Sequence, residues 1–346
     1  MFIIIHTTMS NINISLNPPT GMMDYYPNNI KLRDWLLNTW TYISESYGYK
    51  QYDAPIIENS SLYTRKGGDD ILKEMFNIDS PLNNKLVLRP EMTPSLARMV
   101  LNKIASELMP IKWFSVSQCW RNEAVTRGRR REFYQWNTDM FYGENVKSEI
   151  EIFDIIISFF QKIGLTPSDV VILVSNRMIL QKILTKIGVK DDDMIKAFNL
   201  VDKIEKLSRQ EFEILFCDEL NLSSDAITVL YDLIKVKSIE ELEKFVNCDD
   251  PIVQELILIF RYAKELGIAE WLQLDLSVVR GLSYYTGIVF EGFFRNTTVK
   301  RAICGGGRYD NLLKNYGYVE KVPGIGFGMG NCVIMEGLEE LNMLPE

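Results

Sequence analysis

The sequence contains one histidine, His6, among 346 residues. A lone histidine in a stretch without other functional residues excludes Ser-His-Asp and Cys-His nucleophile chemistry, histidine-ligated metals and a histidine general base. What remains is chemistry carried out by carboxylates, arginines, backbone groups and a metal ion that the substrate brings.

Cysteine is also scarce and scattered. The five residues are far apart, odd in number and without a C-x-x-C pair, which argues against both a zinc ribbon and a secreted disulfide framework and favours a reducing compartment. They are Cys119, Cys217, Cys248, Cys304 and Cys332.

The chain lacks the run of roughly 20 apolar residues that a membrane-spanning helix needs, so we expect no membrane span. Residues 1–17 begin with a short apolar stretch but contain no Lys or Arg, which matches neither a secretory signal nor an Arg-rich transit peptide. We therefore expect a flexible N-terminal tail and a cytoplasmic protein, with an organelle as the alternative.

The chain has no overall positive charge, because 46 acidic residues outnumber 38 basic ones and give a net charge of −8. A general affinity for polyanions is excluded, and any contact with nucleic acid must use a local basic patch. The sequence has one such patch at Arg127–Arg131.

Hydrophobic periodicity predicts an α+β fold, with an antiparallel sheet built from hairpins and helices arranged in blocks. Helices are expected over 28–47, 93–109 and 149–163, and strands over 52–57, 85–88, 113–120, 131–140, 170–175, 272–277 and 284–293. Residues 176–264 are rich in Leu, Ile, Lys and Glu with scarcely a glycine or proline, which predicts a helical insertion. A glycine turn at 305–307 and a glycine-rich strand with a helix over 323–341 complete the chain.

The strongest functional pattern begins at Arg121-Asn-Glu123 and continues through an arginine-rich turn to Asp139. Arginines on a hairpin and its turn form an anion clamp, because guanidinium groups bind phosphate in a bidentate manner and stay charged. A solvated basic hairpin tip is the alternative.

Four further segments carry weaker signals. Glu91 and Thr93 precede a helix and suit either a substrate ammonium or simple helix capping. Arg280, followed by glycine and then by Tyr284 and Tyr285, suits either a pocket or a core strand. Glycines 305–307 before Arg308 suit either a site for a phosphate or a flat ring, or an ordinary loop. Alternate glycines at 324, 326, 328 and 330 suit either a surface for a flat ligand or a tightly packed strand.

Taken together and in this order, these segments resemble histidyl-tRNA synthetases from Pro18 to the C-terminus, with most similarity to a plant-organelle-like or alphaproteobacterial-like variant. The resemblance implies a class II aminoacyl-tRNA synthetase with an antiparallel sheet of six or seven strands flanked by helices. It implies a catalytic domain over 18–175 and 265–346, a helical insertion domain over 176–264, and a homodimer formed partly around Pro55.

The resemblance also implies a function: ATP-dependent activation of histidine, with Mg²⁺ bridging the phosphates, and transfer of histidine to tRNA(His). Arg121 and Arg280 would be catalytic at the α-phosphate. ATP would be held by Arg121, Glu123, Arg129 and Phe133, with Arg308 as a candidate, and histidine by Glu91, Thr93, Arg131, Gln135, Asp139, Tyr284 and Tyr285.

Three departures from the family pattern affect these expectations. The chain reads Gly330-Asn-Cys-Val where most class II enzymes have an arginine that binds the γ-phosphate, so Arg308 or Arg129 is expected to substitute. Ser283 and Ala124 replace an aspartate and an arginine, which alters the expected contacts with the tRNA acceptor end. The sequence ends where an anticodon-binding domain normally begins, which indicates a trimmed or a natural catalytic core.

Two other classes of protein remain as alternatives. A histidine-sensing regulatory subunit of ATP phosphoribosyltransferase would explain the missing domain but not the retained arginines. A plain ATP- or RNA-binding module would bind amino acids with little selectivity.

Overall fold

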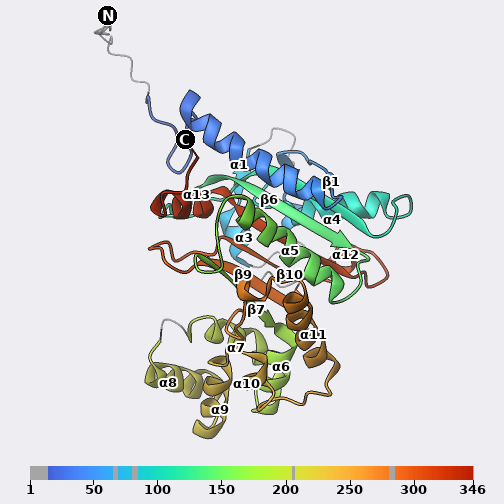
Figure 1. The fold of residues 1–346 in the computed structure, drawn as a ribbon, viewed down its shortest axis with the longest axis vertical. Helices are drawn as coiled ribbons and strands as arrows, with labels where there is room; N and C mark the ends of the chain where they lie inside the picture. Colours follow the sequence, from blue (N-terminus) through green and yellow to red (C-terminus); the bar gives the residue numbers. More distant parts are fainter. Residues whose placement is uncertain (1–14, 65–68, 80–84, 205–206, 280–284, 346) are drawn as a thin grey trace, which may run out of the picture.

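The computed structural model describes residues 15–64, 69–79, 85–204, 207–279 and 285–345. Its described part is built on an eight-stranded sheet with the order β1-β5-β6-β11-β10-β9-β7-β8 (Figure 1). The strands are β1 (Lys50–Gln51), β5 (Ile111–Trp120), β6 (Glu132–Phe141), β7 (Val170–Asn176), β8 (Leu272–Leu274), β9 (Ile288–Phe294), β10 (Cys304–Arg308) and β11 (Gly324–Gly330). The sheet is antiparallel except at its two edges, where β1 runs parallel to β5 and β8 runs parallel to β7. These short edge strands account for the excess over the six or seven strands expected.

One face of this sheet is covered by α1 (Pro27–Ser46), α5 (Lys147–Lys162) and α13 (Asn331–Glu340), which contact β5, β11 and β6 respectively (Figure 1). Helix α5 is apolar on almost every side because it lies between the sheet, α1 and α11. Trp40 of α1 stacks on Trp136 of β6 with ring centroids 5.9 Å apart, and this contact fixes α1 against the sheet.

The opposite face is covered by α4 (Thr93–Lys103) and α12 (Leu312–Asn315), which share a second apolar cluster with β5 and β6. Beside it lies a three-stranded antiparallel sheet in the order β2-β4-β3, with two short helices. Its elements are β2 (Ile57–Asn59), α2 (Ser61–Thr64), α3 (Asp69–Glu74), β3 (Phe76–Ile78) and β4 (Leu86–Leu88). Alternate residues of β6 face this side, and they include Gln135 and Asp139.

All described elements between β7 and η3, just before β8, are helices, as expected for residues 176–264. They are α6 (Arg177–Lys186), η1 (Asp191–Asp193), α7 (Met194–Val201), α8 (Arg209–Leu220), α9 (Ser224–Ile234), α10 (Ile239–Leu242) and α11 (Pro251–Glu265), and η3 (Ala269–Trp271) follows them. Figure 1 shows these helices gathered at the end of the sheet that carries β7. Asp275, which is 1% exposed, pairs with Lys237 and links this helical block to the chain that returns from it.

The prediction of a strand over 52–57 was wrong. Strand β1 ends at Gln51 and β2 begins at Ile57, and residues 52–56 between them are not in a strand. Pro55 has no N–H to donate to a neighbouring strand. The Asp53 carboxylate and the Ala54 carbonyl accept hydrogen bonds from Arg89 instead of from a strand.

The prediction of a glycine turn at 305–307 was also wrong, because these residues form the centre of β10. A Cβ on Gly306 would lie 2.3 Å from the carbonyl oxygen of Gly326 and 2.7 Å from the Cβ of Phe327. Close packing of strands, rather than a turn, therefore requires glycine at this position.

Three element boundaries also differ from the predictions. Helix α4 ends at Lys103 instead of residue 109, β8 ends at Leu274 instead of Ser277, and β9 begins at Ile288 instead of Tyr284. At β8 the Asp275 carboxylate accepts from the backbone N–H of Ser277, which turns the chain out of the sheet.

The packing at β10 predicts that Gly306→Ala lowers the free energy of unfolding by about 3 kcal/mol, since the backbone atoms opposite cannot move without separating the strands. Gly305→Ala is the matched control, because its Cβ would meet nothing closer than 3.6 Å and should change stability by less than about 1 kcal/mol. Urea denaturation of both variants measures the difference, and equal losses would contradict the close packing.

Candidate active site

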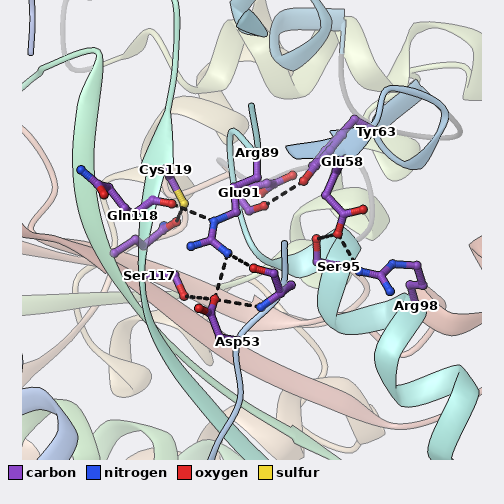
Figure 2. A network of polar contacts seen from close by, with 12 residues as sticks. Asp53, Glu58, Tyr63, Arg89, Glu91, Ser95, Arg98, Ser117, Gln118 and Cys119 are labelled. Atoms are coloured by element: carbon purple, nitrogen blue, oxygen red, sulfur yellow. Dashed lines mark hydrogen bonds and ion pairs between the residues drawn. The ribbon is translucent and has the colours of Figure 1, made fainter. Parts of the chain in front are cut away.

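The segment before α4 is fixed by Arg89, a residue to which sequence analysis gave no role. Arg89 is 2% exposed, and its guanidinium donates to the carbonyls of Gln118 and Ala54 and to the carboxylate of Asp53, at 2.8, 2.5 and 2.9 Å (Figure 2). These contacts join β4, β5 and the chain after β1. Arg89 therefore holds the turn that carries Glu91.

Glu91 is buried, and its burial raises the pKa of its carboxyl to about 7 although the positive charge of Arg121 acts in the opposite direction. Arg121 reaches the same turn, because its Nε donates to the Pro90 carbonyl at 3.0 Å. The capping interpretation of Glu91 and Thr93 was wrong: the N-cap residue of α4 is Met92, and no side chain caps the helix.

The alternate glycines of β11 face polar side chains of β6. A Cβ on Gly326 would lie 2.3 Å from Oδ1 of Asp139, and one on Gly328 would lie 2.5 Å from Nε2 of Gln135. Of the two interpretations that the sequence left open for these glycines, a surface for a flat ligand and a tightly packed strand, the structure favours the second, because the chain's own polar groups occupy this face. The glycines make room for them in the middle of the sheet.

Asp139 is the most buried of the candidate carboxylates, with 3% of the residue exposed. Its Oδ1 accepts a hydrogen bond from the hydroxyl of Tyr309, and its Oδ2 is buried with no hydrogen-bond partner in the described part of the chain. Burial raises the pKa of this carboxyl to about 7, and the Tyr309 hydroxyl opposes that rise. A buried polar atom without a hydrogen-bond partner lowers the stability of the protein, and a bound ligand can supply that partner.

Tyr309 was missed as a site residue, although the Gly-Gly-Gly-Arg-Tyr segment was identified. The residue directly after β10 crosses above β11, so its ring lies 2.8 Å from a Cβ built on Gly324. The Tyr285 ring lies beside it, with centroids 6.2 Å apart. Glu91, Gln135, Asp139, Tyr285 and Tyr309 are thus on the face of the sheet that α4 and α12 cover.

The predicted ATP-binding residues lie along the β5–β6 hairpin. The guanidinium of Arg121 lies over the Phe133 ring, 5.2 Å from its centroid, and Arg129 forms an ion pair with Glu123 and a longer one, at 3.6 Å, with Glu74. Arg131 donates to the backbone carbonyl of Glu123 at 3.0 Å. The structure therefore brings these residues together at the hairpin turn.

Arg308 is placed differently from the other arginines. It is 5% exposed, its Nε lies 2.5 Å from Oε1 of Glu149, and its Nη1 lies 3.2 Å from Asp310. This buried ion pair between β10 and α5 favours a structural role for Arg308 over phosphate binding.

Two predicted residues, Arg280 and Tyr284, lie outside the described residues, as does Ser283. The expected convergence of Arg280 with Arg121 therefore stays a prediction. Among the described residues, no group of three or more His, Cys, Asp or Glu side chains is arranged to hold a metal ion, and no helix is long and apolar enough to cross a membrane.

Comparison with solved structures identifies the fold as that of class II aminoacyl-tRNA synthetases. Histidyl-tRNA synthetase from Nostoc sp. PCC 7120 superposes with a TM-score of 0.83 at 22% identity, covering 96% of this chain and 77% of that one. An ATP phosphoribosyltransferase regulatory subunit/histidyl-tRNA synthetase from Bacillus halodurans superposes with a TM-score of 0.82 at 21% identity, covering 96% and 84%.

Comparison of sequences gives the family. The model of the histidyl-tRNA synthetase family matches residues 21–331. The chloroplastic/mitochondrial histidine–tRNA ligase of Arabidopsis thaliana is 45% identical over 336 residues, which are 96% of this chain and 68% of that protein. The histidine–tRNA ligase of Leptospira biflexa is 32% identical over 327 residues, or 94% and 74% of the two chains. The chain belongs to the histidyl-tRNA synthetase family.

Burial of Asp139 predicts a pH-dependent stability. Its pKa rises from an ordinary 3.8 to about 7 on folding, so the folded state favours the protonated carboxyl. The free energy of unfolding is therefore highest below about pH 4 and falls as the pH rises through 7. Between pH 5 and 7.5 the free energy of unfolding of the wild type should fall by about 2 kcal/mol more than that of Asp139→Asn, whose side chain cannot ionise. Chemical denaturation at both pH values tests this, and parallel losses in the two proteins would contradict it.

Proposed function

We propose that this chain is a histidine–tRNA ligase, which activates histidine with ATP and transfers it to the 3′ end of tRNA(His). The observation that carries the proposal is the 45% identity to the Arabidopsis histidine–tRNA ligase across 96% of the chain. The relatives from Arabidopsis thaliana, Leptospira biflexa and Natronomonas pharaonis, at 45, 32 and 33% identity, are named as ligases, so the regulatory-subunit alternative is not favoured.

The reaction has two steps, neither of which needs a protein nucleophile. A carboxylate oxygen of histidine attacks the α-phosphorus of ATP, the bond to the bridging oxygen of the β-phosphate breaks, and pyrophosphate leaves. A ribose hydroxyl of the tRNA then attacks the carbonyl carbon of the adenylate, and AMP leaves. Both steps develop negative charge on phosphate, which positioned guanidinium groups stabilise.

ATP is proposed to bind along the β5–β6 hairpin. Arg121, which lies over the Phe133 ring, would meet the α-phosphate, and adenine would stack on that ring. Arg129 would leave its ion pair with Glu123 for the outer phosphates, and Glu123 would accept from the adenine amine. Mg²⁺ would come with ATP and would neutralise the charge of its phosphates.

Histidine is proposed to bind on the face that α4 and α12 cover. Asp139, with its buried Oδ2, and Glu91 would ionise to accept the ammonium and imidazole protons, while Gln135 and Tyr285 would line the pocket. Thr93, Arg131 and Tyr284 complete the proposed set, and Arg280 is proposed for the α-phosphate. A different side chain would leave these buried groups unpaired, and this cost gives selectivity.

The remaining proposals concern organisation. We propose residues 176–264 as the insertion domain, residues 18–175 and 265–346 as the catalytic domain, and a homodimer formed around Pro55. Cytoplasm stays the proposed compartment, and the organellar name of the Arabidopsis relative supports the organelle as its alternative.

Exchange of labelled pyrophosphate into ATP tests the first step, and charging of tRNA(His) tests the second. We expect exchange that depends on histidine and that other amino acids do not support. A folded protein that binds histidine but shows no exchange would refute the ligase and restore the histidine sensor. Equal thermal stabilisation by several amino acids would indicate an unselective nucleotide-binding module.

The raised pKa values of Glu91 and Asp139 predict that affinity for histidine falls as the pH drops from 8 to 6, because protonation removes the charge that the ligand ammonium needs. Triazolylalanine, whose ring stays neutral over this range, should show the same fall and so separates the protein's titration from that of imidazole. Calorimetry measures both ligands, and a pH-independent affinity for triazolylalanine would contradict the prediction.

A further inference from the structure

Strand β10 ends in a buried ion triad, which we define as Glu149, Arg308 and Asp310. Arg308 donates from Nε to Oε1 of Glu149 at 2.5 Å and from Nη1 to Oδ1 of Asp310 at 3.2 Å. The three residues are 2, 5 and 9% exposed, respectively. Because Glu149 belongs to the first turn of α5, the Arg308 side chain points to the face of the sheet that α5 covers.

Tyr309 lies between Arg308 and Asp310 in the sequence and points to the other face. Successive side chains of an extended chain alternate between the two faces of a sheet. The Tyr309 ring belongs to the apolar cluster that α4 and α12 share, and its hydroxyl donates to Asp139. The triad therefore holds the chain on both sides of the residue that contacts Asp139.

The part of β10 before Arg308 has little else to fix it by side-chain packing. Residues 305–307 are glycines, so between Cys304 and Arg308 the strand has no side chain that could pack against a helix. Backbone hydrogen bonds to β9 and β11 set its register. Arg308 is thus the first side-chain anchor before Tyr309.

Asp310 extends this anchor to β11. Its Oδ1 also accepts from the Gly324 N–H at 3.2 Å, and the Tyr309 N–H donates to the Gly324 carbonyl at 2.8 Å. A Cβ on Gly326, two residues further along β11, would lie 2.6 Å from the Tyr309 hydroxyl and 2.3 Å from Oδ1 of Asp139. The triad therefore fixes the spacing of the two strands between which Tyr309 reaches Asp139.

A buried ion triad is a poor way to gain stability, because the loss of hydration of the charges offsets their attraction and apolar residues of similar volume serve as well. It is a good way to fix direction. The guanidinium group of Arg308 is a rigid, planar fork, so it can bridge Glu149 and Asp310 in few arrangements of the chain.

We propose that Arg308, held by Glu149 and Asp310, is a positioning residue for histidine, which aims the Tyr309 hydroxyl at Asp139 from the opposite face of the sheet. This inference rests on the proposed binding of histidine at Asp139. It gives the ion triad a part in recognising the amino acid, although its side chains lie on the face that α5 covers.

Pyrophosphate exchange by Arg308→Lys and the wild type is the first test. Lysine keeps the positive charge but cannot bridge both carboxylates as a fork. Loss of a well-aligned hydrogen bond to Asp139 predicts that the KM for histidine rises about tenfold, with the KM for ATP changed less than about twofold.

Lys112→Met is the matched control for this variant. It removes another ion pair of α5, the 2.8 Å contact of Lys112 with Glu151, which joins the helix to β5 rather than to β10. Both KM values should stay within about twofold of the wild type, since a partly exposed pair contributes little to stability. A rise in the KM for histidine equal to that of Arg308→Lys would contradict the proposal.

A double-mutant cycle with Tyr309→Phe shows whether Arg308 acts through the Tyr309 hydroxyl. Calorimetry should find that Tyr309→Phe binds histidine about tenfold more weakly than the wild type. Adding Arg308→Lys to Tyr309→Phe should weaken binding by less than about twofold more. Single effects that multiply in the double variant would overturn the assignment.

Replacement of the buried pair by apolar residues separates position from stability. Glu149→Leu with Arg308→Met removes both charges, while Asp310 keeps its contact with Lys321. Urea denaturation should show stability near that of the wild type, yet histidine should bind about tenfold more weakly. Wild-type affinity in this variant would refute the positioning role, and if the variant does not fold, the cycle with Arg308→Lys decides.

The behaviour of the wild type keeps this test distinct from that of the proposed function. No histidine-dependent exchange by the wild type would refute the ligase itself. Normal exchange by the wild type, with the same KM for histidine in Arg308→Lys, would refute only the role of Arg308.

Discussion

The site depends on polar side chains lying inside the central sheet, and glycine on the neighbouring strand is what allows this. Gln135 and Asp139 occupy space that a Cβ at Gly328 or Gly326 would fill. Burying a carboxyl in this way is unfavourable unless hydrogen bonds or a ligand compensate. Tyr309 supplies one hydrogen bond to Asp139, and the second carboxylate oxygen has no hydrogen-bond partner among the described residues, which is why we propose that histidine binds there. The glycine pattern, the raised pKa and the proposed selectivity therefore have one physical origin.

The arginines of the β5–β6 hairpin turn form ion pairs with carboxylates of the chain, which a bound triphosphate would replace. Arg129 pairs with Glu123 and Glu74, and Arg127 pairs with Glu336 and Glu340, so the hairpin turn is neutralised by the chain itself. The arginines of these pairs are 36–52% exposed, where an ion pair contributes little to stability, although the side chain of Glu123 is only 8% exposed. A triphosphate can displace them at small cost, whereas the Arg308–Glu149 pair is buried and would be expensive to break. Burial thus separates arginines that are available to a ligand from one that holds the fold.

Much of the fold was predictable from the sequence, because the long elements carry strong periodicity. The hairpin of β5 and β6, helix α5, strand β7 and the helical block after it lie where hydrophobic patterns indicated. Residues 305–307 were mistaken for a turn, since three glycines in sequence look alike whether the chain bends or two strands pack closely around them. Tyr309 and Arg89 were missed for a related reason: their roles come from contacts with residues 170 and 36 positions away in the sequence, which no local pattern records.

Strand β10 fixes the position of Tyr309 in the proposed site. Tyr309 follows the last residue of this strand, Arg308, and its hydroxyl donates to Asp139. The strand is hydrogen-bonded on both sides and packed without side chains at its centre, which leaves it little freedom to bend. The reacting carboxylate and α-phosphate would have to meet between the proposed amino-acid pocket and the β5–β6 hairpin, and Arg121 contacts both the turn of Glu91 and the ring of Phe133.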